Sequence, residues 1–279
     1  MTLDAHQHFW KYDPGEYSWI GDTMAVLKRD FLPEDLAREQ AKLHFDGSIA
    51  VQARQTLEET RWLLELARTD ERIRAVVGWV DLRSPSVATE LEHFCNDPKF
   101  IGVRHVVQDE PDPRFMLQPD FLRGLGLLKS FGLTYDILIF PKQLPAAIEI
   151  ARQFPDQPFV LDHIAKPAIA QGTLEPWNNQ IKELGKFQNV CCKVSGLVTE
   201  ADWKNWNVNQ FTPYLDVIVE AFGEDRLMVG SDWPVCLLAA SYEEVVGLVR
   251  NYFQPFSAEA RQKIFGGNAS RFYTRRKRA

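Results

Sequence analysis

The sequence predicts a single-domain α/β protein, a (β/α)₈ TIM barrel that spans residues 1–279. Three observations support this fold class. The chain contains eight short apolar runs, amphipathic segments lie between most of them, and its 279 residues are close to the roughly 250 typical of such barrels. A doubly wound open sheet is the alternative, but no G-x-G-x-x-G pattern follows an early strand.

The apolar runs are the expected barrel strands. Several of them are continuously apolar and rich in Val and Ile, which is typical of strands buried on both faces. We expect strands near residues 2–6, 47–53, 73–80, 101–107, 133–139, 158–163, 189–195 and 226–231.

The segments between the runs have helical spacing of apolar residues. Thr56 with Glu59, and Ser241 with Glu244, form capping-box pairs at two helix starts. The stretches 10–33 and 108–119 read instead as long loops, the second lying over the active face. We expect helices at 57–69, 85–95, 119–131, 142–154, 176–187, 209–222 and 241–253, with one or two more in 257–274.

Composition and charge exclude several classes of partner. The net charge of −6 argues against a nucleic-acid partner, and no apolar run reaches the ~20 residues of a membrane span. The basic run 275–278 reads as a solvated helix end, with a polyanion-binding tail as the alternative. The N-terminus has no secretory signal pattern, and none of the four cysteines forms a C-x-x-C motif. We therefore expect a cytoplasmic protein.

The candidate site lies where the strands end, because barrel enzymes place their chemistry at the carboxyl ends of the strands. His6 and His8 end the first strand and, being two positions apart, point the same way. His163 ends the sixth strand beside Asp162, and Asp232 follows the eighth strand. A buried carboxylate at that position needs a partner. Singly, these residues also fit surface histidines, a structural histidine and a helix N-cap.

Further residues are candidates for substrate binding. Arg104 in the fourth strand suits an oxygen or carboxylate group, with an inter-strand ion pair as the alternative. Lys193 in the seventh strand either donates to a hydroxyl or forms a buried pair with an acid such as Asp162. Aromatic rings at a barrel mouth stack on sugar rings or pack as hydrophobic caps, and the candidates are Trp19, Trp79, Tyr135 and Trp233.

Several of these motifs resemble the amidohydrolase superfamily, and most closely its sugar-lactonase branch of L-fuconolactonase and L-rhamnono-lactonase types. The resemblance rests on DAHQHFW (4–10), LDHIAKP (161–167) and GSDWP (230–234). YSWI (17–20), GVRHVVQDEP (102–111), KVSGL (193–197) and IFGGNASRFY (264–273) extend it along the chain. The resemblance implies a hydrolase whose partner is a small-molecule sugar lactone.

Two departures from the wider superfamily bear on the metal content. Its two-metal members carry a bridging lysine or glutamate on strand 4 and a histidine ending strand 5. Here the corresponding segments offer Arg104–Val106 and Tyr135–Asp136. We therefore expect one divalent ion at most, with zinc the best match, or no required ion. The expected ligand set is His6, His8, His163 and Asp232.

Opening a lactone needs a base for water and positive charge near the carbonyl oxygen. We assign Asp232 as the base, with His6, His8 and His163 polarising the carbonyl and Arg104 steadying the carboxylate that forms. A single-metal decarboxylase of an aromatic or unsaturated acid is the alternative enzyme, and a non-catalytic sugar-acid binding protein is the alternative without chemistry. The sugar, the lactone ring size and the oligomeric state, a homo-oligomer included, stay open.

Overall fold

The computed structural model describes residues 1–274 and confirms the expected barrel. Eight parallel strands form one sheet in sequence order. The basic run 275–278 lies outside the described residues. The strands are β1 (Leu3–Gln7), β2 (Gly47–Val51), β3 (Ile73–Gly78), β4 (Phe100–Val106), β5 (Thr134–Leu138), β6 (Phe159–Leu161), β7 (Val190–Val194) and β8 (Leu227–Val229).

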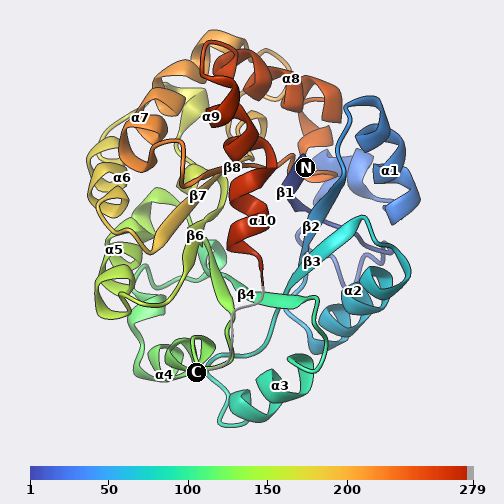
Figure 1. The fold of residues 1–279 in the computed structure, drawn as a ribbon, viewed down its shortest axis with the longest axis vertical. Helices are drawn as coiled ribbons and strands as arrows, with labels where there is room; N and C mark the ends of the chain where they lie inside the picture. Colours follow the sequence, from blue (N-terminus) through green and yellow to red (C-terminus); the bar gives the residue numbers. More distant parts are fainter. Residues whose placement is uncertain (275–279) are drawn as a thin grey trace.

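Within the described residues, helices α1 to α8 surround the strands, and the shorter α9 and α10 follow; Figure 1 shows this arrangement. In these segments apolar residues recur at helical spacing, so each helix has one apolar stripe. Each helix buries that stripe against the strands, which places the helices around the outside of the barrel. The helices are α1 (Pro33–Lys42), α2 (Leu57–Thr69), α3 (Val87–Phe94), α4 (Pro119–Leu128), α5 (Leu144–Gln153), α6 (Trp177–Gly185), α7 (Thr212–Phe222), α8 (Tyr242–Phe253), α9 (Ala258–Gln262) and α10 (Asn268–Phe272).

The barrel closes where the ends of β1 and β8 meet. Gln7 and Trp233 form a parallel bridge. The His8 N–H donates to the Trp233 carbonyl at 2.7 Å, and the Asp232 N–H donates to the His6 carbonyl at 2.9 Å. The seam therefore fixes the backbones of four candidate residues, His6, His8, Asp232 and Trp233, against one another.

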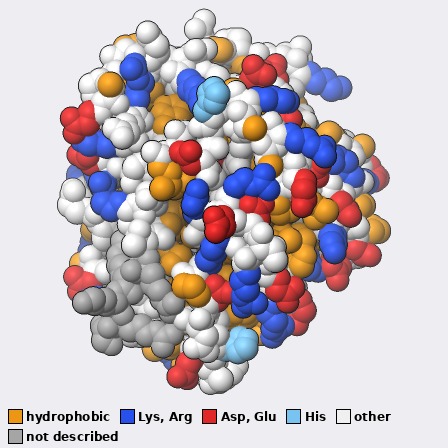
Figure 2. All heavy atoms as spheres, turned by 45° about the vertical axis from the view of Figure 1, so that its right-hand side comes forward, with side chains coloured by type: hydrophobic (Ala, Val, Ile, Leu, Met, Phe, Trp, Pro, Cys, Tyr) orange, Lys and Arg blue, Asp and Glu red, His pale blue; other side chains and the backbone are white. Residues whose placement is uncertain are grey.

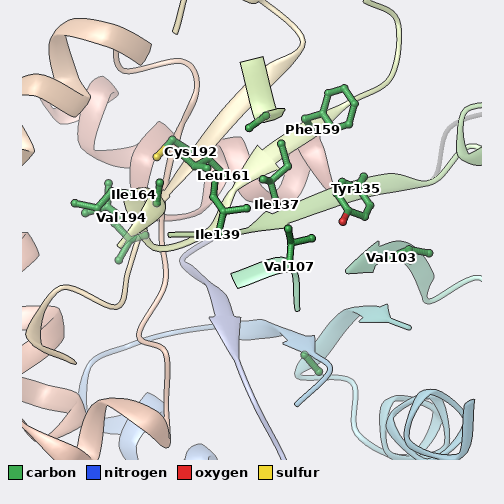
Figure 3. Close-up of a cluster of buried hydrophobic side chains, with 14 of the residues drawn as sticks. Val103, Val107, Tyr135, Ile137, Ile139, Phe159, Leu161, Ile164, Cys192 and Val194 are labelled. Carbon is green, nitrogen blue, oxygen red and sulfur yellow. The ribbon is translucent and has the colours of Figure 1, made fainter. Parts of the chain in front are cut away.

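Two apolar layers hold the barrel. The outer one lies between strands and helices, and Figure 3 shows Val103, Ile137, Leu161 and Val194 from four successive strands gathered in it. The inner one fills the amino-terminal end of the barrel with side chains from six strands, and residues 272–273 pack against it. Figure 1 accordingly shows α10 lying across the centre of the strands. This end of the barrel is closed by its own chain.

Several strands end sooner than the sequence suggested. The expected strands over 47–53 and 73–80 stop at Val51 and Gly78. At the site, the one over 158–163 stops at Leu161 and the one over 226–231 stops at Val229. The residues after Leu161 turn sharply, with His163 to Lys166 all at φ between 49° and 60°. Left-handed conformations are strained for such side chains and concentrate at functional sites. The predicted helical stretch 257–274 is likewise divided, by a π turn at Lys263–Gly267.

On the face drawn in Figure 2, acidic and basic side chains lie interspersed, so neither sign of charge dominates that face. Opposite charges set side by side weaken the field that either sign projects. Within residues 1–274, no helix combines the length and the apolar character that a membrane span requires.

Candidate active site

Four predicted residues converge at the carboxyl end of the barrel. The Nε2 atoms of His6 and His8 lie 3.2 Å apart. Asp232 Oδ1 lies 3.3 Å from His8 Nε2 and 3.8 Å from Nε2 of both His6 and His163. All four side chains are at least 95% buried. The alternatives of surface histidines and a helix N-cap are therefore excluded, because the carboxylate faces three imidazoles.

The Nδ1 atoms of His8 and His163, on the side of each ring away from the site, have hydrogen-bond partners. His8 Nδ1 donates to the Val51 carbonyl at 2.8 Å, and His163 Nδ1 lies 2.9 Å from Ser195 Oγ. Such contacts fix ring orientation and leave Nε2 facing the site. Gly196 makes room for His163, since a Cβ there would lie 2.6 Å from Nδ1.

Burial sets the charge of these groups. It lowers the pKa of His6 and of His163 well below 6.5, so both rings are neutral near pH 7. Burial alone would raise the pKa of Asp232, but its proximity to His163, His8 and Lys166 outweighs burial and brings the pKa below 3.8. Asp232 is therefore an ionised acceptor beside neutral imidazoles, which is what a general base requires.

A charged layer lies directly beneath this cluster, inside the barrel. Lys193 Nζ lies 2.6 Å from Asp136 Oδ2, 2.9 Å from Asp162 Oδ1 and 3.1 Å from His6 Nδ1. Arg104 Nη1 donates to Asp162 Oδ2 at 3.1 Å. The sequence alternative for Lys193, a buried pair with Asp162, is thus what the structure shows.

A cavity of about 570 Å³ opens above the cluster. His8, His163, Asp232 and Arg104 form part of its lining, and Trp19 from the β1–α1 loop forms another part, as predicted. Sequence reasoning missed several polar lining residues. Lys166 belongs to the quoted LDHIAKP motif and was therefore findable. Gln108 and Asp109 likewise belong to the GVRHVVQDEP motif and to the loop expected over the active face. Glu16, Arg54 and Gln55 also line the cavity and were not among the predicted residues.

Four residues predicted to bind substrate do not line this cavity: Trp79, Tyr135, Trp233 and Lys193. Lys193 is enclosed by its ion pairs. Tyr135 pairs in register with Val103, and both point outward into the layer beneath the helices (Figure 3). Strand alternation explains this position, because the neighbouring residue, Asp136, takes the inward side.

The two tryptophans serve packing. Trp233 is 2% exposed and meets the rings of Phe9 and Phe31 edge-on. Trp79 donates its indole N–H to His105 Nδ1 of β4 at 3.4 Å. The hydrophobic-cap alternative therefore describes Trp233, whereas Trp79 contacts the neighbouring strand.

The donor atoms fit a single divalent ion. Zinc–nitrogen bonds of about 2.1 Å in a tetrahedron place donors roughly 3.4 Å apart. Within the triad of His6, His8 and Asp232 the donor distances run from 3.2 to 3.8 Å, and His163 Nε2 lies 3.8 Å from Asp232 Oδ1. A second candidate triad within the described residues joins His6 and His163 to Asp162. Lys193 and Arg104 already neutralise that aspartate, so only the triad containing Asp232 is available.

Comparisons with known proteins show what the chain is similar to. The family model described as Amidohydrolase matches residues 3–275. An L-fucono-1,5-lactonase of Burkholderia multivorans is 44% identical, covering 98% of this chain and 96% of that protein. Another, from Burkholderia ambifaria, is 37% identical, covering 98% and 95%.

A solved structure is also similar over its full length. It is an amidohydrolase of Burkholderia multivorans with bound zinc, 43% identical, with a TM-score of 0.96 and coverage of 99% of this chain and 100% of that one. Sequence identity at this level over the whole barrel, together with the match of the family model, places the chain in a family: it belongs to the amidohydrolases.

Proposed function

We propose that the protein hydrolyses a sugar-acid lactone, an aldonolactone such as L-fucono- or L-rhamnono-lactone, to the free acid. The convergence of ionised Asp232 with three imidazoles at the floor of a 570 Å³ cavity carries this proposal. The L-fucono-1,5-lactonases that match the chain over almost its whole length support the choice of substrate class.

Asp232 acts first as the general base. Its carboxylate takes a proton from water while the water oxygen bonds to the lactone carbonyl carbon. When the ring C–O bond breaks, the protonated carboxyl returns that proton to the leaving oxygen, which becomes a hydroxyl group. The acid product then loses its own proton to solvent, so the reaction releases one proton per turnover.

The remaining residues orient and polarise the carbonyl. His6, His8 and His163 surround the point where negative charge develops, and fixed dipoles there stabilise a transition state more than water does. Arg104 lines the cavity, and its Nε has no hydrogen-bond partner among the described residues. That buried donor is suited to a substrate oxygen or to the carboxylate product.

A metal ion fits the same residues. His6, His8, His163 and Asp232 would hold one divalent ion, zinc best, and such an ion would supply Lewis-acid polarisation of the carbonyl. The zinc-bound structure of the similar amidohydrolase supports this assignment. The buried ring contacts to Val51 and Ser195 hold His8 and His163 in place with or without the ion.

The test is a panel of aldono-1,4- and 1,5-lactones assayed by proton release, with and without chelator. We expect turnover of at least one lactone, and Asp232→Asn should reduce kcat by about 10²- to 10⁴-fold. Asp156→Asn, at an exposed carboxylate paired with Lys129 on the outside of the barrel, is the matched control. Near-normal activity of folded Asp232→Asn would overturn the base assignment, and release of carbon dioxide without lactone turnover would favour the decarboxylase.

A further inference from the structure

Lys166 brings a positive charge to the wall of the cavity, and a carboxylate lies beside it. The Lys166 ammonium group is 3.5 Å from Glu200 Oε1, and the two side chains are 16% and 19% exposed. Lys166 lines the cavity, whereas Glu200 ends the short turn that follows β7 and does not. Opposite charges this close together largely cancel at the distance of a bound ligand. The pair therefore offers N–H donors to the cavity without a net positive charge.

Arg54 is matched in the same way on another wall. Its Nη1 forms a salt bridge with Glu16 Oε2, and its Nε lies 3.8 Å from Glu59 Oε1. Arg54 and Glu16 both line the cavity, and they come from the loops that follow β2 and β1. Arg54 therefore also contributes N–H groups to the lining while its charge is already balanced.

The charged layer at the floor is balanced too. Arg104 Nη1 donates to Asp162 Oδ2 at 3.1 Å, and Asp162 also pairs with Lys193, whose second carboxylate partner is Asp136. Two cations thus face two carboxylates. Asp232 is different, because within residues 1–274 its ion-pair partners are histidines alone. The chain leaves no lysine or arginine charge unmatched in this lining, and the base adds a negative one.

Such a balance selects ligands by their charge. A carboxylate substituent on a lactone ring would meet no unmatched cation and would lie in the field of Asp232, so the cost of removing it from water would not be repaid. A hydroxyl group costs less to bury, and its oxygen can accept from the N–H groups of Lys166 or Arg54. The cavity is therefore suited to ligands that are polar but uncharged.

We propose that Glu200 and Glu16 determine substrate specificity. By neutralising Lys166 and Arg54, these two carboxylates restrict the cavity to uncharged, hydroxylated lactones and exclude lactones that carry a carboxylate. The lactone part of this inference rests on the proposed function, whereas the exclusion of anions rests on the ion pairs alone.

The test compares sugars that differ only at C6. Galactose and glucose carry a CH₂OH group there, and galacturonate and glucuronate carry a carboxylate. These six-membered rings lack the ester bond of a 1,5-lactone, so binding is measured without turnover, as Kd from ligand-observed NMR titrations. Chelator treatment and dialysis first remove divalent ions, so that only the charges of the chain are compared. The pH is 7.5, far above the ordinary glutamate pKa of 4.5, because burial raises the pKa of Glu200.

Glu200→Gln removes the negative charge and keeps the shape of the side chain. Two charges about 10 Å apart at an effective dielectric constant of about 20 change an affinity by roughly tenfold. We therefore expect Glu200→Gln to bind the uronates about tenfold more tightly than the wild type does, with less than about a twofold change for the neutral sugars.

Two further variants complete the experiment. Glu16→Gln should have a smaller effect of the same sign, because Glu16 is 55% exposed and water screens its charge. It also covers the case that Glu200→Gln does not fold. Glu220→Gln removes the same charge from an exterior pair with Lys182 at 2.8 Å, and it should leave both affinities unchanged.

Equal affinities of the wild type for neutral sugars and uronates would overturn the proposal, and so would an affinity for uronates that stays unchanged in both Glu200→Gln and Glu16→Gln. The proposed hydrolysis fails separately. If the wild type opens no lactone but Glu200→Gln gains affinity for the uronates, the selection by charge stands without the reaction.

Discussion

The Val51 carbonyl accepts the hydrogen of His8 Nδ1 and fixes the orientation of that ring, and Ser195 Oγ contacts His163 Nδ1 on the equivalent side. Because Asp232 is ionised between these two rings, the three side chains are arranged for proton transfer before a substrate arrives. Preorganised groups of this kind stabilise a transition state without the cost of reorienting during the reaction.

The pH dependence of activity follows from these residues. The reaction needs Asp232 ionised and His163 neutral, and the pKa of each lies below its ordinary value. Acidification protonates both groups, so activity is lost toward low pH, but only below the ordinary histidine value of 6.5. The check is kcat/KM measured against pH. An acid limb centred at or above pH 6.5 would contradict the assignment.

Single residues also show where sequence reasoning reached its limit. His6, His8, His163 and Asp232 were predictable because polar residues at strand ends share one barrel rim. Tyr135 was assigned to the wrong side because a strand position alone does not show which alternate residue faces inward. Lys166 belongs to the LDHIAKP motif, but its position in the cavity lining depends on a left-handed turn that the residue types Ile-Ala-Lys do not predict.

That turn is the most unusual element of the site. Residues His163 to Lys166 are left-handed without a glycine or asparagine among them, so no turn rule based on those residues could have predicted it. The eight strands and most helices, in contrast, follow from the apolar periodicity and agree with the structure within a few residues. Local strain that tertiary packing enforces leaves no comparable pattern in a sequence.

The segment that packs against the turn provides a test. Gly196 has φ +62°, and a Cβ there would lie 2.6 Å from His163 Nδ1. Gly196→Ala should displace the His163 ring and lower kcat by more than tenfold, since small misplacements at a reacting centre cost up to about a hundredfold. Gly172 has φ +65° with no atom within 4 Å of its Cβ position. Gly172→Ala therefore carries the same backbone strain, and equal activity losses in both variants would refute the contact argument.

The start of α2 should respond to pH through Glu59. Its carboxylate accepts the N–H groups of Ala53 and Arg54, yet burial raises its pKa from 4.5 to about 7. A raised carboxyl pKa favours the folded state below pH 4.5, and this contribution is lost as the pH rises through 7.

Glu59→Gln removes that titration and keeps an acceptor oxygen. The free energy of unfolding of the wild type relative to the variant should fall by about 3 kcal/mol between pH 4.5 and about pH 8. Urea unfolding at the two pH values measures it. Stability curves that run parallel over this range would show that Glu59 does not titrate as described.

At the scale of the whole molecule, zinc should stabilise the fold. An ion that binds only the folded protein adds about 2.7 kcal/mol to the free energy of unfolding at a concentration of 100 Kd. Thermal unfolding should therefore shift upward with zinc in the wild type, and the shift should be much smaller in His8→Ala. Magnesium is a suitable control because it prefers oxygen ligands. An equal zinc shift in both proteins would place the ion elsewhere.

The seam between β1 and β8 also governs when the molecule becomes active during its synthesis. His6 is translated before its partner Asp232, which follows it by most of the sequence. A nascent chain that has not yet reached β8 therefore lacks part of the candidate site. Esterase activity should thus appear only with the finished barrel, which spares the cell the indiscriminate hydrolysis that a fragment with an exposed base could cause.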